Sequence, residues 1–218
     1  MSDLSRREAE ELMEVQGQEA EELFFRAHRV RLEHRGRGVE FCSIINAKSG
    51  HCPQDCAFCA QSSHNDAPIE RYPLVSVETV LEGARRAVEH GAARYSIVTS
   101  GAGALEEPER RLLVQAIEAM VQELPVKPCA SLGMLSRADL ARLRDAGLRR
   151  YHHNLETAES FFPQICTTQS YGDSLATIEA ARELGLSLCV GGLFGLGERP
   201  KQRVELLWTL RELGGEAV

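Results

Sequence analysis

The segment Val39-Glu-Phe-Cys-Ser-Ile-Ile-Asn46 leads into the loop Gly50-His-Cys-Pro-Gln-Asp-Cys-Ala-Phe-Cys59, and the order of these two segments indicates the fold. The first stretch is apolar and β-branched, which predicts a strand. The loop then carries three cysteines spaced four and three residues apart. A strand whose carboxyl end delivers such side chains is how a β/α barrel places its active site. The sequence therefore predicts a barrel with a thiolate site after its first strand.

The three thiols of the loop, Cys52, Cys56 and Cys59, fit a four-iron (4Fe-4S) cluster, because cysteine thiolates hold such clusters at this sort of spacing. A cubane needs four ligands, and the loop offers three. One iron is then open to a small chelating ligand, of which the amino and carboxylate ends of S-adenosylmethionine are the best-known example. Electron transfer to the sulfonium then releases a 5′-deoxyadenosyl radical, which is cofactor chemistry that the protein positions.

Two other interpretations of the cysteines remain open. Three cysteines with His51 or His64 also fit a tetrahedral zinc site, although a second zinc-type pair is missing. The chain has seven cysteines, which allows disulfides, but their spacing is irregular. Residues 1–7 lack the apolar region of a signal peptide. We therefore expect a cytoplasmic protein whose thiols are reduced.

Composition excludes several functional classes. The 218 residues are enough for one substantial domain, and 43% of them are hydrophobic and 26% charged, as in ordinary globular proteins. The net charge of −7 argues against nucleic acid as a partner, because no basic stripe is available to neutralise phosphates. No apolar run approaches the ~20 residues of a membrane span, so we expect no membrane partner.

The rest of the chain alternates between helix and strand. Residues 1–36 predict an N-terminal helical segment of two helices broken around Gln16 and Gly17, and residues 37–218 predict a barrel domain. After the loop, periodicity and capping residues predict helices over 76–89, 108–124, 136–147, 174–184 and 200–213 and strands over 94–100, 126–131, 149–154 and 186–194. This alternation means a parallel sheet with right-handed crossovers.

The predicted elements amount to about five strands, and residues 216–218 stand where a sixth should start. A (β/α)8 barrel takes ~250 residues. We therefore expect an α/β fold, a parallel (β/α) barrel of the TIM type that is truncated and incomplete, with N-terminal helices. A genuine five-stranded open α/β sheet is the alternative.

Four segments resemble the biotin synthase family of the radical S-adenosylmethionine (SAM) superfamily; they are Asn46–Ser63, Tyr151–Thr157, Ile165–Thr168 and Cys189–Glu198. The resemblance runs from about residue 12 to the end. It implies an enzyme that inserts sulfur into dethiobiotin to form biotin, with the 4Fe-4S cluster on the loop and an auxiliary cluster, 2Fe-2S or of altered type, as sulfur donor. It also implies an electron donor such as flavodoxin or ferredoxin, and a homodimer.

The resemblance assigns roles to residues beyond the three loop cysteines. Phe58 matches an aromatic position beside the adenine of the cofactor. Asn154 and Glu156 match positions that contact substrate and cofactor, and a carboxylate suits the ribose hydroxyls because it accepts two O–H donors. Gly191 and Gly192 would let the backbone pass close to the cofactor, with a packing or turn role as the alternative.

The auxiliary cluster matches less completely. In the family three inward-facing cysteines and an arginine hold it; Cys129 and Cys189 match two of them, Ser96 stands at the third, and the arginine falls beyond residue 218. Serine is a poor replacement for a thiolate on iron. Cys42, on the first strand, is placed to serve instead, so we expect Cys42, Cys129 and Cys189 to hold an altered cluster. The alternative for Cys42 is a buried core thiol.

Further departures leave other functions open. Ser174 stands where the family often has an arginine for the methionyl carboxylate, and serine cannot copy the guanidinium fork. Cys166 is interpreted as a core or loop thiol, and His152 and His153 as substrate lining or packing. The alternative functions are a related radical enzyme with one cluster, which Ser96 favours, and a truncated inactive iron–sulfur protein.

Overall fold

The computed structural model describes residues 4–103 and 105–217, and its centre is one parallel sheet. The strands follow one another in chain order across the sheet: β1 (Cys42–Lys48), β2 (Arg94–Thr99), β3 (Lys127–Ser131), β4 (Arg150–His152) and β5 (Ser187–Cys189). Each strand is followed by a helical crossover, which is the repeating unit of a β/α barrel. The predicted fold class, an incomplete parallel barrel of five strands, is confirmed.

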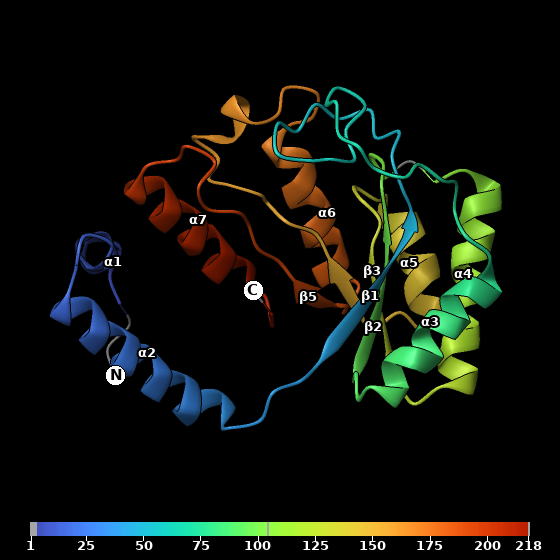
Figure 1. Cartoon of the computed structure of the whole chain (residues 1–218), viewed down its shortest axis with the longest axis horizontal. Helices are drawn as coiled ribbons and strands as arrows, with labels where there is room; N and C mark the ends of the chain where they lie inside the picture. Colours follow the sequence, from blue (N-terminus) through green and yellow to red (C-terminus); the bar gives the residue numbers. More distant parts are fainter. Residues whose placement is uncertain (1–3, 104, 218) are drawn as a thin grey trace.

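Helices cover the outer face of the sheet (Figure 1). They are α3 (Val77–Glu89), α4 (Glu107–Glu123), α5 (Arg137–Asp145), α6 (Tyr171–Glu183) and α7 (Pro200–Leu213). Serines begin three of them: Ser76, Ser136 and Ser170 each accept a hydrogen bond from the main chain three residues on. These caps satisfy amide groups that have no partner within the helix. The cap at Ser136 stands at the first residue of the helix predicted over 136–147.

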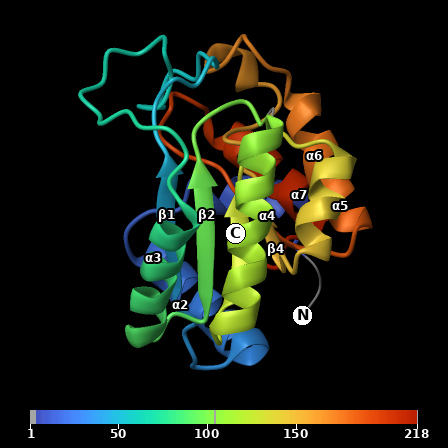
Figure 2. The same ribbon diagram turned by 90° about the vertical axis from the view of Figure 1, so that its right-hand side faces the viewer.

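The core lies between the sheet and these helices, and Figure 2 shows α3 and α4 in front of β1 and β2. Because side chains alternate along a strand, one set of each strand is buried against the helices. Tyr95, Ile97, Ala130 and Tyr151 belong to that set and are 2% exposed or less. The other set faces the concave side of the sheet, which is where chemistry can be placed.

The N-terminal helices stand apart from this core. They are α1 (Arg6–Leu12) and α2 (Gln18–Arg35), and they are separated at Gly17, which has φ 55°. The predicted break is therefore confirmed. α1 contacts α7, whereas α2 has no buried residue. Figure 1 shows both helices on the opposite side of the molecule from α3 and α4.

A further strand begins next to β5. Val190 N donates to Ala217 O at 3.0 Å, and Ala217 N donates to Leu188 O at 3.3 Å. Ala217 and Cys189 form a parallel bridge, so the start of a sixth strand predicted at residues 216–218 is confirmed for Ala217. Among residues 4–103 and 105–217, β1 pairs with β2 alone, so the barrel is not closed.

The elements differ from the sequence prediction most clearly at β4, β5 and a short 3₁₀ helix. β4 and β5 have three residues each, shorter than the predicted 149–154 and 186–194. The amides of His153 and Leu155 still donate to Cys189 O and Gly191 O, but regular strand geometry ends because Glu156 adopts φ 65°, which lies outside the strand region. A 3₁₀ helix at Phe162–Gln164 was not predicted. None of the described helices is long and apolar enough to cross a bilayer.

Candidate functional site

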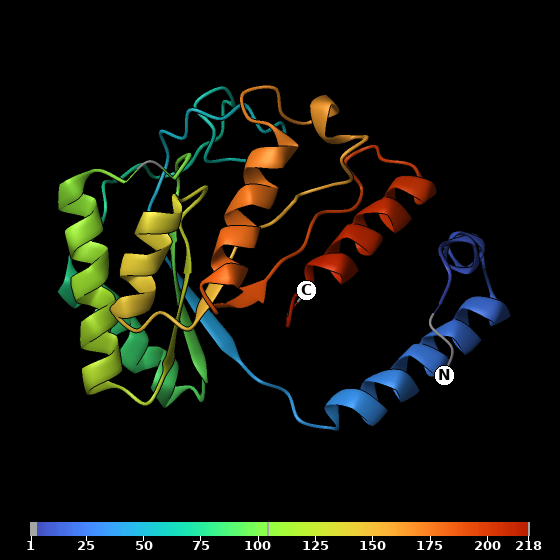
Figure 3. The ribbon, with the colours of Figure 1, turned by 180° about the vertical axis from the view of Figure 1, so that it is seen from behind.

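The cysteine loop follows the carboxyl end of β1 and lies beside the segment that follows β4 (Figure 1, Figure 3). A hydrogen bond of 2.9 Å from Ala57 N to Ile165 O joins the two segments. Within the loop the side-chain amide of Asn65 donates to Cys56 O and Cys59 O, both at 2.9 Å. The main chain around two of the three cysteines therefore has a defined shape.

Asp55 clamps the loop to the neighbouring segment. Its carboxylate accepts hydrogen bonds from Thr167 N at 2.8 Å and Thr168 N at 3.2 Å, and both threonine hydroxyls donate to it. The hydrogen bonds from Thr167 hold the pKa of the Asp55 carboxyl well below its usual range, so it is ionised at neutral pH. Sequence reasoning did not find this Asp55 clamp. The available signal was an acidic residue between two cysteines.

The loop thiols lie close enough to affect one another. Burial raises the pKa of the Cys56 thiol, and the neighbouring thiols Cys166, Cys59 and Cys52 raise it further. Three thiolates this close repel each other unless cations lie among them. In the described ranges no three His, Cys, Asp or Glu side chains converge on one metal ion. A cubane presents its irons at separate corners, and three thiolates on one loop are a donor set that such a cluster takes.

The cysteines of the strands line a cavity on the concave side of the sheet. Cys42, Cys129 and Cys189 all line it, together with Ser96, and its volume is about 780 Å³. The strand register explains the meeting, because Ser96 lies opposite Cys129 and Cys189 lies opposite His152. Cys42 is exposed, so the alternative that it is a buried core thiol is wrong.

Two strand arginines line the same cavity, Arg94 from β2 and Arg150 from β4, and Arg35 at the end of α2 lines it as well. Burial raises the pKa of Cys129 to about 11, and Arg94 and Arg150 oppose that rise. Arg150 is held by hydrogen bonds to Ser187 Oγ at 2.8 Å and Glu216 Oε2 at 3.3 Å. Sequence reasoning looked for an arginine beyond residue 218 and missed this pair. The sequence signal for them was their position two residues before Ser96 and His152, because residues two apart on a strand face the same side of the sheet.

The two histidines after Tyr151 lie in different surroundings. His152 lines the cavity, and its Nδ1 is 3.1 Å from Cys189 Sγ. Burial lowers the pKa of both rings, that of His153 to about 4, so both are neutral at pH 7. His153 Nε2 is buried without a hydrogen-bond partner among the described residues. His152 is thus the histidine of the pair that contacts a candidate ligand.

Asn154 and Glu156 lie on the segment between β4 and the 3₁₀ helix. Main-chain hydrogen bonds from Leu155 N to Gly191 O and from Leu193 N to Glu156 O tie this segment to the one after β5. Burial raises the pKa of Glu156 to about 7, although a hydrogen bond with Asn154 opposes the rise. A buried carboxyl that titrates near neutral pH is a feature of functional sites.

The predicted glycines have different surroundings. A Cβ at Gly192 would lie 2.6 Å from Leu206 Cδ2 and 2.7 Å from Glu156 O. Residue 192 must therefore be glycine for the two segments to approach. A Cβ at Gly191 would lie 3.3 Å from Asn154 Oδ1, which is a milder contact. At Gly192, therefore, the close packing of two protein segments accounts for the glycine, which was the alternative to close approach of a cofactor.

Glu198 is a buried acid that sequence reasoning did not select. It accepts hydrogen bonds from Gly195 N and Leu196 N, both at 2.8 Å, and from Arg203 Nε at 2.7 Å. Although burial opposes it, the bonds from Gly195 and Arg203 lower the pKa of Glu198 to about 2. Glu198 therefore holds the loop after β5 in place as a permanent anion.

The remaining predicted positions are Phe58 and Ser174. Phe58 is partly buried and packs against the hydrophobic core. Ser174 is 2% exposed within α6, so it lies in the packed part of the molecule. Cys166 is 3% exposed, which confirms its interpretation as a core or loop thiol.

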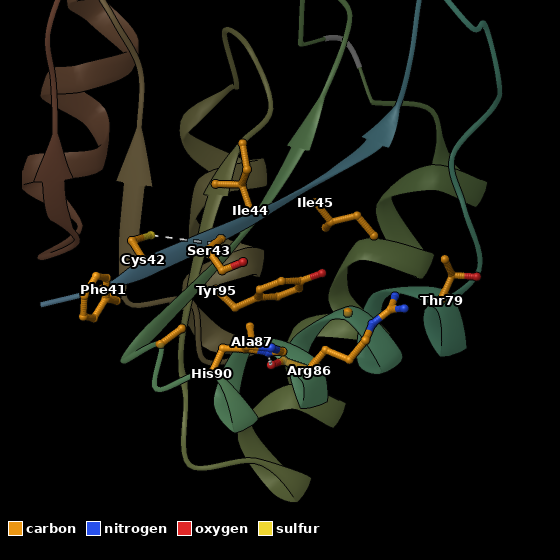
Figure 4. A pocket seen from close by; sticks show the side chains of 12 residues that line it. Phe41, Cys42, Ser43, Ile44, Ile45, Thr79, Arg86, Ala87, His90 and Tyr95 are labelled. Atoms are coloured by element: carbon orange, nitrogen blue, oxygen red, sulfur yellow. Dashed lines mark hydrogen bonds between the residues drawn. The ribbon is translucent and has the colours of Figure 1, made fainter.

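A second hollow, of about 470 Å³, lies between β1 and α3 (Figure 4). Ile45 and Tyr95 extend toward α3 in this view, and Thr79, Arg86 and His90 come from that helix and its end. Cys42 is the one cysteine that lines it. It offers no second thiol, so the candidate site is confined to the loop and the cavity.

Comparison with known proteins agrees with this geometry. Residues 47–208 match the model of the Radical SAM superfamily. The chain is 51% identical over 215 residues to a biotin synthase of Trichlorobacter lovleyi, covering 99% of this chain and 65% of that protein. It is 46% identical over 217 residues to a biotin synthase of Geobacter sulfurreducens, covering 100% and 66%. The chain thus spans about two thirds of the length of these relatives.

Solved structures show the same fold at low sequence identity. Methylornithine synthase matches with a TM-score of 0.87 at 21% identity, over 98% of this chain and 63% of that one. The FeFe-hydrogenase maturase of Carboxydothermus hydrogenoformans matches with a TM-score of 0.79 at 22% identity, over 97% and 51%. The resemblance to the biotin synthases seen in the sequence is confirmed, and this chain belongs to the radical SAM superfamily.

Proposed function

We propose that this chain carries the catalytic site of a radical SAM enzyme that inserts sulfur into dethiobiotin to form biotin. The observation that carries the proposal is the cysteine loop, whose ligand set Cys52, Cys56 and Cys59 is held at the carboxyl end of β1 by the Asp55 clamp. The similarity to biotin synthases supports the choice of substrate. In this proposal the three thiolates hold a 4Fe-4S cluster.

The residues around the loop would bind S-adenosylmethionine. When bound, the cluster and the cofactor together supply an electron and a carbon radical for hydrogen abstraction. Glu156 is placed to accept hydrogen bonds from the ribose hydroxyls in its ionised form. Asn154 and the main chain at Gly191 and Gly192 would orient the cofactor, and Phe58 would lie beside the adenine.

The cavity would hold the auxiliary cluster through Cys42, Cys129 and Cys189. This part of the proposal is supported by the fact that the three cysteines line one cavity, together with Ser96, which stands where the family has a cysteine. Arg94 and Arg150 bring positive charge to the thiolates there, although each is also paired with a glutamate of the cavity wall, Glu40 and Glu216. The cluster would differ from that of the family, because its third cysteine ligand, Cys42, comes from β1, whereas the family's third cysteine stands at the position of Ser96 on β2.

The proposal extends to partners and organisation. Residues 1–36 form a helical segment separate from the barrel domain of residues 37–218. The enzyme is cytoplasmic, receives electrons from a flavodoxin or ferredoxin and works as a homodimer. These properties are carried over with the resemblance to biotin synthases.

Anaerobic reconstitution with iron and sulfide tests the loop. We expect about four irons on the loop of the Cys129→Ser variant, and cleavage of S-adenosylmethionine to 5′-deoxyadenosine with a strong reductant. A Cys56→Ala variant should lose both. Full iron content and cleavage in Cys56→Ala would refute the assignment. Formation of biotin from dethiobiotin by wild-type chain tests the substrate.

A related radical enzyme with one cluster is the second candidate, and Ser96 favours it. The iron count separates the two. If the cavity holds a cluster, wild-type chain contains more iron than Cys42→Ser and Cys129→Ser, and both variants lose the same spectroscopic signal. If Cys42→Ser leaves that signal unchanged, Cys42 is not a ligand. If no variant of the cavity lowers the iron content, the single-cluster enzyme is correct.

A further inference from the structure

Cys166 is a buried thiol in contact with a proposed cluster ligand. Its Sγ lies 3.6 Å from Cys56 Sγ, and its side chain also reaches Asp55 Oδ1 at 3.2 Å. No other pair of cysteine sulfurs in the described part of the chain is in hydrogen-bond contact. The function proposed above gives Cys166 no task, although it lies next to the middle cysteine of the loop.

The main chain on both sides of this pair is held in place. Ala57 N donates to Ile165 O at 2.9 Å, so the residues that adjoin Cys56 and Cys166 are hydrogen-bonded to each other. The Asp55 clamp fixes the same two segments from the other side. A disulfide has an S–S distance of about 2.05 Å, so the sulfurs must approach by roughly 1.5 Å. Rotation of the two side chains supplies a movement of this size.

We propose that Cys56 and Cys166 form a redox modification site, a disulfide that closes when the loop carries no cluster. The disulfide withdraws one of the three loop ligands, so it blocks cluster loading until a thiol reduces it. A bound cluster has the opposite effect, because it occupies the Cys56 thiolate and leaves Cys166 as a free thiol. The proposal of a disulfide depends only on the contact between the sulfurs of Cys56 and Cys166. Its effect on cluster loading rests on the proposed function of the loop.

The oxidant in this step is a low-molecular-weight disulfide such as oxidised glutathione. Cys56, the more accessible of the two thiols, loses its proton as it attacks one sulfur of the oxidant, and one glutathione leaves and takes up a proton as a thiol. Cys166 then attacks the mixed disulfide at Cys56 and releases the second glutathione. Two protein thiols are oxidised and one small disulfide is reduced to two thiols, so protons and electrons balance.

Peptide mapping of the wild-type chain is the direct test. The full chain is stripped of iron with a chelator under reducing conditions, desalted anaerobically and incubated with oxidised glutathione. After alkylation and digestion without reductant, we expect a linked pair of peptides containing Cys56 and Cys166, two hydrogens lighter than their sum. The cluster-loaded chain should give Cys166 in its alkylated form. A link among Cys52, Cys56 and Cys59 with Cys166 free would overturn the proposal.

Two variants control for other cysteines. Cys166→Ser keeps all three loop ligands and should give no linked peptide, whereas Cys42→Ser, changed outside the pair, should still give it. Reduced wild-type chain should take up loop iron about tenfold faster or more than oxidised chain, and Cys166→Ser should load equally in both conditions. If oxidation slows loading in Cys166→Ser as well, another cysteine is responsible and the proposal is wrong.

The outcomes also separate this proposal from the function of the loop. If reduced chain takes up no iron, the cluster assignment fails while the peptide map still decides the disulfide. Thermal unfolding gives an independent measurement, because the disulfide joins residues 110 positions apart and cross-links of long loops stabilise the folded state. We expect the iron-free oxidised chain to unfold at a higher temperature than the reduced one, and Cys166→Ser to show no such difference.

Discussion

The cysteine loop and the cavity each bring thiols together, and they do so in opposite ways. The loop draws Cys52, Cys56 and Cys59 from one short segment and fixes it with the Asp55 clamp. The cavity draws one cysteine from each of β1, β3 and β5. The loop site therefore depends on a local segment and its clamp, whereas the cavity site depends on the register of the whole sheet.

This difference determines how each proposed site would lose its metal and which of the two tolerates a change of ligand position. A loop can be altered without moving the sheet, but its three proposed ligand positions all lie on one short segment, and Cys166 is the further thiol in contact with it. In the cavity the ligand positions are spread over strands, so a thiol on one strand can replace a residue on another. Cys42 and Ser96 lie on adjacent strands and line the same cavity, which makes such an exchange geometrically simple.

The largest expected effect is a complete and separate loss of iron from each region. Cys59→Ser should remove the loop iron and keep the cavity iron, and Cys129→Ser should do the reverse, because the two ligand sets share no residue. Iron analysis with electron paramagnetic resonance of the reduced samples measures both. If either variant loses both clusters while its secondary structure by circular dichroism matches wild type, the two sites are not independent.

The next effect concerns the clamp. Asp55→Ala removes the acceptor for two main-chain amides and two hydroxyls, and residues that orient metal ligands typically contribute about 10- to 100-fold in affinity. We expect loop iron to be lost that much more readily to a chelator, with faster hydrogen exchange at Thr167 and Thr168. The control is Asp66→Ala, an acidic residue beyond the cysteines with no hydrogen bond to Thr167 or Thr168. Equal chelation rates in the two variants would contradict the role of the clamp.

A smaller effect concerns the stability of the contact between the segment after β5, at Gly192, and the segment after β4, at Glu156. Gly192→Ala places a Cβ against Leu206 and the main chain, and such overpacking costs typically about 1–3 kcal/mol of the free energy of unfolding. Gly191→Ala is the matched control and should cost less, since its nearest contact is one side-chain oxygen. Urea denaturation of both iron-free variants measures the difference; equal losses would remove the special role of Gly192.

The smallest effect is a pH dependence at the same junction. Burial raises the pKa of Glu156 to about 7, so the folded chain keeps a proton that the unfolded chain releases near its ordinary pKa of ~4.5. The contribution of Glu156 to stability is therefore full at low pH and is lost as the pH rises from ~4.5 to 7. Glu156→Gln should stabilise the iron-free chain at pH 8 by roughly 1–2 kcal/mol, and by almost nothing at pH 4.5.

The control for this pH dependence is Glu198→Gln, whose effect should have the opposite sign. Hydrogen bonds lower the pKa of Glu198 to about 2 despite its burial. Wild-type chain should be the more stable at neutral pH, and its advantage should shrink as the pH falls from ~4.5 toward 2. Urea midpoints across this range measure both variants. A Glu156→Gln variant that is less stable than wild type at pH 8 would contradict the raised pKa.

The sequence predicted what depends on neighbouring residues. Helix caps such as Ser136 and breaks such as Gly17 act within one turn, so the order of elements was predicted and is confirmed. The spacing of the loop cysteines is likewise local. The positions of Cys129 and Cys189 on inward-facing strand sites came from the resemblance, and the cavity now contains both.

What the sequence did not predict depends on contacts between distant segments. The Asp55 clamp joins residues 112 positions apart. Arg94 and Arg150 line the cavity through the register and alternation of β2 and β4, and single-sequence patterns do not specify register. β4 and β5 are short because regular pairing stops at His152 and Cys189, and resumes only as a single bridge between Glu156 and Gly192. Neither partner of that pair carries a local signal for it.

The Asp55 clamp also sets an order of events during synthesis of the chain. Asp55 leaves the ribosome long before Thr167, and a domain made of sequential β/α units folds as those units become available. Until the segment at Thr167 and Thr168 has emerged and folded, the cysteine loop lacks its anchor and its defined shape. On the proposed function, a cluster would enter the clamped loop only after the fourth strand has formed, although all three proposed ligands are present from residue 59 onward.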